Sequence, residues 1–163
     1  MKNSLIALSL VAGSLVMALP AVAQEGVAES EVSVRALFSP DGSTTGLFGG
    51  AGISHRAGAL YFGGAGYGGP VVSQPRGGMG YGGAILGASN AIAGGLDFDA
   101  RLLVGGGGGS IGGNGAGSFA LEPSIALGLA LPGESKLSLT AGYLYMPRAT
   151  QFNGATVGLR FLH

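Results

Sequence analysis

The feature that most restricts the fold of this chain is an alternation of large apolar residues with small or polar ones, repeated over many short segments. In residues 136–145, for example, apolar or aromatic side chains occupy every second position from Leu137 onward. Successive side chains of a β-strand point to opposite faces, so this pattern predicts strands with one apolar face. Residues 119–131 and 155–161 repeat it. After residue 23 there is no run of about 20 apolar residues, which disfavours a transmembrane helix.

The residues on the other face of each predicted strand distinguish a membrane barrel from a soluble β-sandwich. That face carries Gly, Ala, Ser and occasional charges, whereas the solvent face of a soluble sheet is usually charged. Only 10% of the residues are charged, and 35 are glycine. Small and polar residues suit the narrow bore of a closed barrel, and large apolar residues suit contact with lipid. Because lipid cannot satisfy backbone polar groups, a spanning sheet must close on itself.

Clusters of Gly, Pro, Asn and Asp divide the chain into eight predicted strands. These strands span residues 31–39, 44–56, 58–68, 77–87, 94–105, 116–131, 135–146 and 155–163. The register within 58–87 stays open because the segment is so rich in glycine. With both termini in the periplasm, the external connectors are Pro40–Ser43, Gly69–Arg76, Gly106–Gly115 and Pro147–Gly154. The periplasmic connectors lie near Ala57, at Ala88–Ala93 and at Pro132–Glu134.

The first 23 residues have the features of a signal peptide. Lys2 precedes the apolar segment Leu5–Leu19, and Ala21-Val22-Ala23 matches an A-x-A cleavage site. We therefore expect cleavage after Ala23, with residues 24–163 forming a barrel in the outer membrane of a Gram-negative bacterium. An uncleaved membrane anchor is the alternative.

Eight charged residues fall on predicted inward positions. They are Arg35, Arg56, Asp97, Asp99, Arg101, Glu122, Lys136 and Arg160. A charge in a bore of low dielectric constant must be paired, so we expect a structural network of ion pairs that fills the interior. The alternatives are a polar permeation path and a buried acid–base pair.

Eight aromatic residues are predicted to face outward near the two ends of the strands. They are Phe38, Phe62, Tyr81, Phe98, Phe119, Tyr143, Tyr145 and Phe161. Aromatic side chains of membrane barrels gather where lipid meets water, so these residues predict two aromatic girdles.

Together these features resemble the small eight-stranded outer-membrane β-barrels of the OmpA and OmpX type. The Ala-Val-Ala cleavage site, the alternating strands and the closing sequence Val157–Phe161 carry the resemblance. It implies an all-β fold, a closed antiparallel up-and-down barrel of eight strands, and insertion by the barrel-assembly machinery, which reads a terminal aromatic residue. This chain departs from that pattern, because Leu162 and His163 follow Phe161. No individual family is matched, so no functional residue carries over.

No motif supports catalysis, a cofactor or a metal. Gly64–Gly69 fits G-x-G-x-x-G, but chance explains such a match at this glycine content, and no helix is predicted after it. Gly105–Gly109 lacks the Gly-Lys-Ser/Thr of a phosphate-binding loop and is expected to be a flexible external loop. The chain has no cysteine, and its formal net charge of zero gives no reason to expect a nucleic-acid partner. We expect no catalytic, cofactor-binding or metal-binding residue.

The sequence thus predicts a non-enzymatic barrel, a monomer with porin-like architecture, whose external loops carry a structural or surface-interaction role. Its expected partners are outer-membrane lipid and lipopolysaccharide, which Arg76 and Arg148 in the loops could contact. Three alternatives stay open: a narrow pore for small solutes, an outer-membrane lipid-modifying enzyme, and a secreted, self-assembling glycine-rich protein. The pore needs an open bore. The enzyme needs a Ser or carboxylate within hydrogen-bond reach of His55 or His163, both expected at the periplasmic end.

Overall fold

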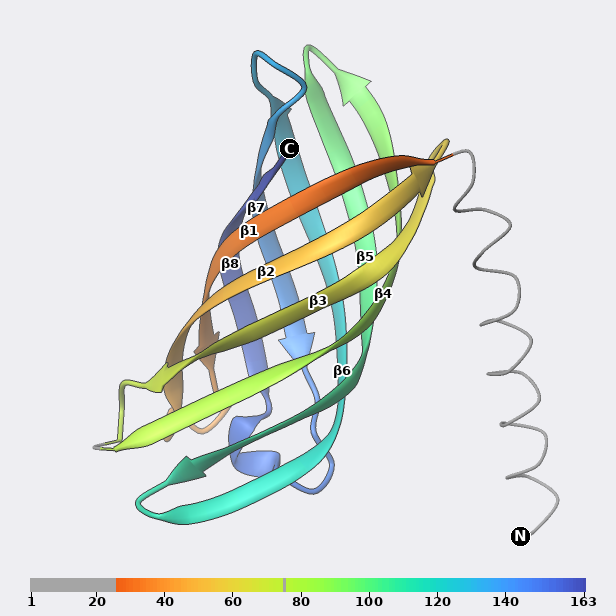
Figure 1. Cartoon of the computed structure of the whole chain (residues 1–163). Coiled ribbons are helices and arrows are strands. Elements are labelled where there is room, and N and C mark those ends of the chain that lie inside the picture. The colour runs from red at the N-terminus through yellow and green to blue at the C-terminus, as the bar shows by residue number, and fades with distance from the viewer. Residues whose placement is uncertain (1–25, 75) are drawn as a thin grey trace, which may run out of the picture.

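The computed structural model describes residues 26–74 and 76–163, and this part of the chain forms one closed sheet of eight strands (Figure 1). The strands are β1 (Val27–Phe38), β2 (Thr45–Ala57), β3 (Leu60–Val71), β4 (Gly77–Ala93), β5 (Leu96–Ile111), β6 (Asn114–Ala130), β7 (Lys136–Leu144) and β8 (Gly154–Leu162). Each strand pairs antiparallel with the next, and β8 pairs with β1 to close the barrel. The predicted all-β, up-and-down architecture is confirmed. The predicted signal peptide, residues 1–23, lies outside the described residues.

The alternation in the sequence becomes an inner and an outer wall. On β7, Ser138 and Thr140 are buried in the bore, whereas Leu137 and Leu139 are 41% and 57% exposed on the outside. Most of the other strands repeat this division, so large apolar side chains cover much of the outer wall. On β3 it is reversed: Gly64, Gly66 and Gly68 face outward, and the larger side chains face inward. In the described part of the chain, no helix has the length and apolar character needed to cross a membrane.

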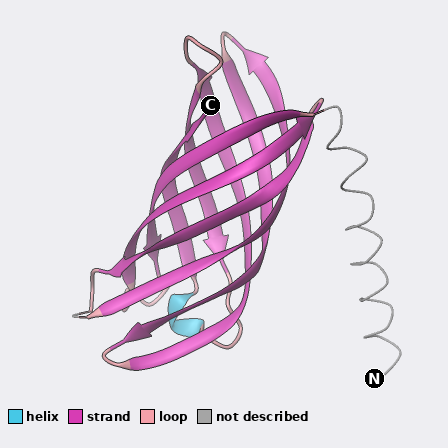
Figure 2. Ribbon diagram, viewed as in Figure 1, coloured by secondary structure: helices cyan, strands magenta, loops and turns pink. Residues whose placement is uncertain are grey.

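The two ends of the barrel differ in their connections (Figure 2). β1 begins and β8 ends at the same end, here called the terminal end, where the connectors are residues 58–59, 94–95 and 131–135. The opposite end, here called the loop end, has the connectors 39–44, 72–76, 112–113 and 145–153. The last of these contains a short 3₁₀ helix, η1 (Thr150–Phe152).

The expectations of an external connector at Gly106–Gly115 and of a flexible loop at Gly105–Gly109 were wrong. β5 and β6 run through this segment and turn only at Gly112 and Gly113, whose φ angles of 59° and 88° suit a two-residue hairpin turn. Gly107 pairs with β4 on one side and with β6 on the other. These ladders satisfy the glycine backbone on both sides, which offsets the entropy lost when glycine is ordered.

Two further connectors are also shorter than expected. Ala88–Ala93 belongs to β4, and the chain turns instead at Gly94 and Gly95, with φ angles of 61° and 79°. Residues 69–71 belong to β3, so the Gly69–Arg76 connector shrinks to 72–76. The open register of 58–87 resolves into continuous pairing of β3 with β4, from Leu60 opposite Ala88 to Val71 opposite Gly77.

Inward and outward glycines have different roles in this barrel. A Cβ atom added to Gly50 would lie 2.0 Å from Cδ1 of Tyr67, and one added to Gly87 would lie 2.2 Å from Cζ of Tyr61. The missing side chains therefore leave space for tyrosine rings in the bore. At Gly49, which faces outward, an added Cβ would meet nothing within 4 Å.

Candidate functional site

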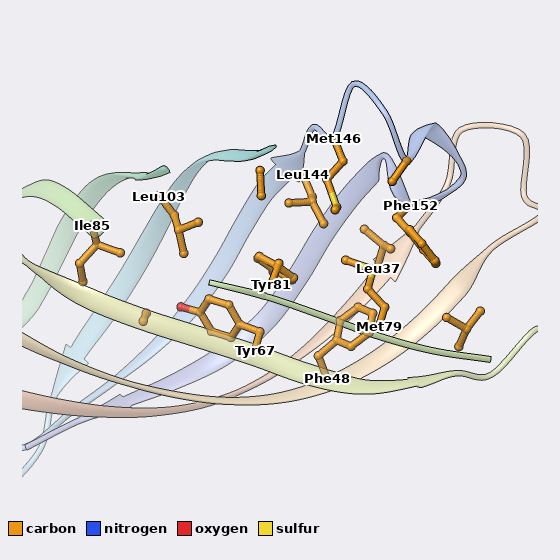
Figure 3. Close-up of a cluster of buried hydrophobic side chains, with 14 of the residues drawn as sticks. Leu37, Phe48, Tyr67, Met79, Tyr81, Ile85, Leu103, Leu144, Met146 and Phe152 are labelled. Carbon is orange, nitrogen blue, oxygen red and sulfur yellow. The ribbon is translucent and has the colours of Figure 1, made fainter. Parts of the chain in front are cut away.

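An apolar cluster fills the bore at the loop end (Figure 3). We call part of this cluster the apolar plug; this part comprises Leu37, Phe48, Val71, Met79, Leu103, Ala120, Leu144, Met146, Ala149 and Phe152. The connector 145–153 folds inward to complete it, and Met146 and Phe152 have no exposed surface. Asn153 Oδ1 accepts a hydrogen bond from Met146 N (2.5 Å), and Ser118 Oγ accepts one from Arg148 N (3.0 Å). These bonds hold the connector against the barrel.

A buried carboxylate lies next to the apolar plug. Arg35 Nη1 donates to both carboxylate oxygens of Glu122 at 2.8 Å. Thr156 Oγ1 and Tyr81 OH donate to the same carboxylate at 2.7 and 3.3 Å. The Arg35 guanidinium carbon also lies 4.0 Å from the centre of the Tyr67 ring. Charge, hydrogen bonds and a cation–π contact thus offset part of the cost of burying this pair, although Arg35 Nε and Nη2 have no hydrogen-bond partner within the described residues.

A second group of ion pairs lies nearer to the terminal end. Arg101 Nη1 donates to Glu31 Oε2 at 2.8 Å, and Arg101 Nη2 donates to Tyr67 OH at 2.6 Å. Arg160 Nη2 lies 3.0 Å from Asp99 Oδ1. Two tyrosines complete the group: Tyr67 OH donates to Glu31 Oε1 and Tyr61 OH to Asp99 Oδ1, both at 2.9 Å.

Two more ion pairs lie closest to the terminal end and are partly exposed. Arg56 donates to Glu29 through Nε (2.7 Å) and Nη2 (3.0 Å). Lys136 pairs with Asp97. The bore therefore changes along its axis from an apolar plug, through buried ion pairs, to partly exposed ion pairs.

The structure places every predicted bore charge in this network. Each of the eight residues, from Arg35 to Arg160, forms at least one ion pair. Glu31 and Glu29 also face the bore but were not predicted, although both share the inward parity of Arg35 on β1. The inward tyrosines of β3 were not predicted either: Tyr67 lies among glycines that give no alternation, and Tyr61 lies between two other apolar residues, Leu60 and Phe62.

Seven of the eight aromatic residues predicted to face outward do face outward in the structure. Six of them are 40–51% exposed on the outer wall, and Phe62 is partly exposed beside His55. Phe38 is the last residue of β1 and Tyr143 the second-last of β7, so both lie toward the loop-end ends of their strands. The outward placement of Tyr81 was wrong. Its ring is 4% exposed and its hydroxyl reaches Glu122, because Met79, Tyr81 and Ile85 set an inward parity on β4 that the surrounding glycines conceal.

Both histidines lie at the terminal end, and one has a serine partner. Ser135 Oγ and His163 Nδ1 are 3.0 Å apart on the exposed surface. This contact meets the distance required for a nucleophile and its base. Within the described residues, no acidic side chain is hydrogen-bonded to His163, and the Ser135 hydroxyl also donates weakly to the Gly133 carbonyl at 3.4 Å. Nor does any group of three or more His, Asp or Glu residues there suit a metal ion.

The first connector of the loop end is organised by one carboxylate. Asp41 Oδ1 accepts hydrogen bonds from Ser39 Oγ (2.7 Å), Ser43 N (3.1 Å) and Ser43 Oγ (2.8 Å). These bonds, above all the one from Ser39, lower the pKa of Asp41 to about 2. The expected loop cations, Arg76 and Arg148, are also exposed at this end. The loop end therefore presents both signs of charge around the apolar plug.

Comparison with known proteins supports the fold alone. No protein-family model matches this chain, and no curated protein matches its sequence. Among solved structures, the barrel is similar to the crystal structure of Neisserial surface protein A (NspA), with a TM-score of 0.64 and 14% sequence identity. The alignment covers 83% of this chain and 94% of that chain. The resemblance to eight-stranded outer-membrane barrels is thus confirmed at the level of the fold.

Proposed function

We propose that this protein is a monomeric, non-enzymatic outer-membrane barrel that conducts no solutes and acts through its loop end, as a structural or surface-interaction protein. One observation carries the proposal: the outer wall is apolar while the bore is filled along its length. A filled bore leaves the loops and the outer wall as the surfaces available for function. The likeness to a surface protein agrees with this role.

The filled bore disfavours the alternative of a pore. A permeating solute would have to displace Phe152 and Met146 at the loop end and then separate the Arg35–Glu122 pair. Separating a buried ion pair is costly. In planar lipid bilayers we therefore expect no conductance above that of protein-free membranes. Steady single-channel currents from the native protein would favour the pore instead.

Location and folding are tested together by envelope fractionation and gel electrophoresis. We expect the protein in the outer-membrane fraction, and a different mobility for unheated and boiled samples, because closed barrels resist detergent. Recovery from the medium or an insoluble matrix would support the secreted glycine-rich protein.

The proposed partner of the loops is the anionic surface of lipopolysaccharide, with Arg76 and Arg148 as cationic contacts. The double variant Arg76→Gln/Arg148→Gln should bind lipopolysaccharide vesicles more weakly, and the loss should shrink at high salt. The matched control is Arg56→Gln, which removes a cation at the opposite end of the barrel. Unchanged binding by the double variant would exclude this contact.

An enzyme remains the second candidate because of the Ser135–His163 contact alone. A purified barrel that hydrolyses a lipid ester, and loses that activity in Ser135→Ala, would replace the proposal. We expect no such activity, since an exposed serine without an acid behind its histidine is poorly activated.

A further inference from the structure

The pairing of β6 with β7 is interrupted at one proline. Ser124 pairs with Gly142, and Leu121 pairs with Tyr145 through hydrogen bonds of 3.0 and 2.8 Å. This register places Pro123 of β6 opposite Tyr143 of β7. The backbone groups of Tyr143 point toward β6, because those of Tyr145 do and alternate residues of a strand share that direction.

Pro123 leaves one backbone acceptor of the barrel wall without a donor. Proline has no N–H, so it cannot bond to the Tyr143 carbonyl. Within residues 26–74 and 76–163, neither a side chain nor a backbone group outside the strand ladders donates to this carbonyl. Proline is rare inside a central strand, and an unpaired carbonyl is especially unfavourable where lipid replaces water.

A groove of about 570 Å³ lies on the outer wall over this interruption. Three small side chains line it: Ala100 of β5, Pro123 of β6 and Ala141 of β7. Larger side chains border it, among them Leu86 and Ile125, each 53% exposed. Its volume is in the range of small-molecule binding sites, and its lining is almost entirely apolar.

We propose that this groove binds the hydrocarbon chain of an amphiphile that carries a hydroxyl or amide N–H beside the chain, and that this group donates to the Tyr143 carbonyl. The inference rests on the proposed location, because it requires the outer wall to face lipid. A second barrel is a poorer occupant, since a convex wall does not enter a concave groove. The position of the groove agrees with such a ligand: Tyr143 is the second-last residue of β7 before the loop end, where the polar end of a lipid can reach it.

Two photoreactive fatty acids test the proposal. They have equal chain length and a diazirine in the chain, and only one carries a β-hydroxyl. The mature protein is inserted into vesicles of phosphatidylethanolamine and phosphatidylglycerol, and its folding is checked by gel mobility before irradiation. Mass spectrometry then locates the label. We expect the label to concentrate on β5–β7 beside the groove, with about three- to tenfold more from the hydroxylated probe, the effect of one hydrogen bond.

Three variants separate the chain contact from the hydrogen bond. Ala141→Leu fills the groove and should reduce labelling by both probes. Ala36→Leu, which enlarges an outward alanine of β1, is the matched control and should not. Pro123→Ala restores an N–H opposite Tyr143, so it should keep the labelling but remove the preference for the hydroxylated probe.

Different outcomes would refute the groove site and the proposed outer-membrane barrel. If the protein does not insert into vesicles in a folded form whose gel mobility changes on boiling, the membrane barrel is refuted. A folded protein labelled evenly around its wall, or equally by both probes, would refute the groove site and leave the barrel intact. Retention of the hydroxyl preference in Pro123→Ala would show that the Tyr143 carbonyl is not the acceptor.

Discussion

At the scale of single residues, Glu122 joins three distant strands. Its carboxylate accepts hydrogen bonds from Arg35 of β1, Tyr81 of β4 and Thr156 of β8, and it is 1% exposed. In Glu122→Gln the Arg35 charge stays buried without its counter-charge, so we expect the free energy of unfolding to fall by about 3–5 kcal/mol. Urea titration of the folded form, followed by gel mobility, measures this change. Glu134→Gln, at an exposed turn, is the control and should change it by less than about 0.5 kcal/mol.

Asp41 provides a prediction about pH. Its pKa of about 2 in the folded protein lies below the ordinary value of 3.8, so the ionised form stabilises the 39–44 connector. That stabilisation is complete above pH 3.8 and disappears as the pH falls through about 2. The ¹³C shift of the Asp41 carboxyl should therefore titrate near pH 2. In the double variant Ser39→Ala/Ser43→Ala it should titrate near 4, and a native midpoint near 4 would contradict the hydrogen-bonded turn.

Individual inward charges could be predicted because each interrupts a strongly alternating strand. Arg160 stands between the large outward residues Leu159 and Phe161, and Arg35 and Arg101 each have one large outward neighbour, so the parity is set. Tyr81 could not be placed, since glycine on both sides gives no parity. The partner of each charge could not be predicted either, because it depends on the stagger of strands that are far apart in sequence.

At the scale of elements, Gly49 and Gly50 of β2 provide a matched pair of variants. In Gly50→Ala the new methyl would collide with the Tyr67 ring, whereas in Gly49→Ala it would point into open space. We expect Gly50→Ala to lower the free energy of unfolding by about 1–3 kcal/mol, as overpacking does. Gly49→Ala should leave it unchanged or raise it by up to about 1 kcal/mol, because alanine restricts the unfolded chain. Equal effects in urea titrations would contradict the packing of Tyr67 against β2.

Strand ends were harder to predict than strands. A run of glycines is typical of a flexible loop, yet residues 105–109 form part of β5 because β4 and β6 provide hydrogen bonds on both sides. Such pairing is a property of the sheet and is absent from the local sequence. The same cause lengthened β4 past Ala88.

At the scale of the whole molecule, two similar turns allow a test of the orientation of the barrel in the membrane. Gly94-Gly95 and Gly112-Gly113 are both two-residue turns, but they lie at opposite ends of the barrel. If the termini are periplasmic, an epitope inserted between Gly112 and Gly113 should bind antibody on intact cells. The same epitope between Gly94 and Gly95 should bind antibody only after the outer membrane is permeabilised. The reverse pattern would invert the proposed orientation.

The closed fold was predictable because period-two alternation, small inward residues and the absence of long apolar runs all favour one solution. The apolar plug was not predictable. Met146, Ala149 and Phe152 belong to a connector without alternation, and their burial depends on how that connector folds back over the bore.

The strand that closes the barrel is also the last to be synthesised, and it carries Arg160 beside the outward Leu159. Sliding β8 by one residue against β1 would turn that guanidinium toward hydrocarbon and force leucine among the acidic groups of the interior. A slip of one residue is therefore penalised by electrostatics as well as by lost pairing. Arg160 thus favours the native register of the pairing between β8 and β1.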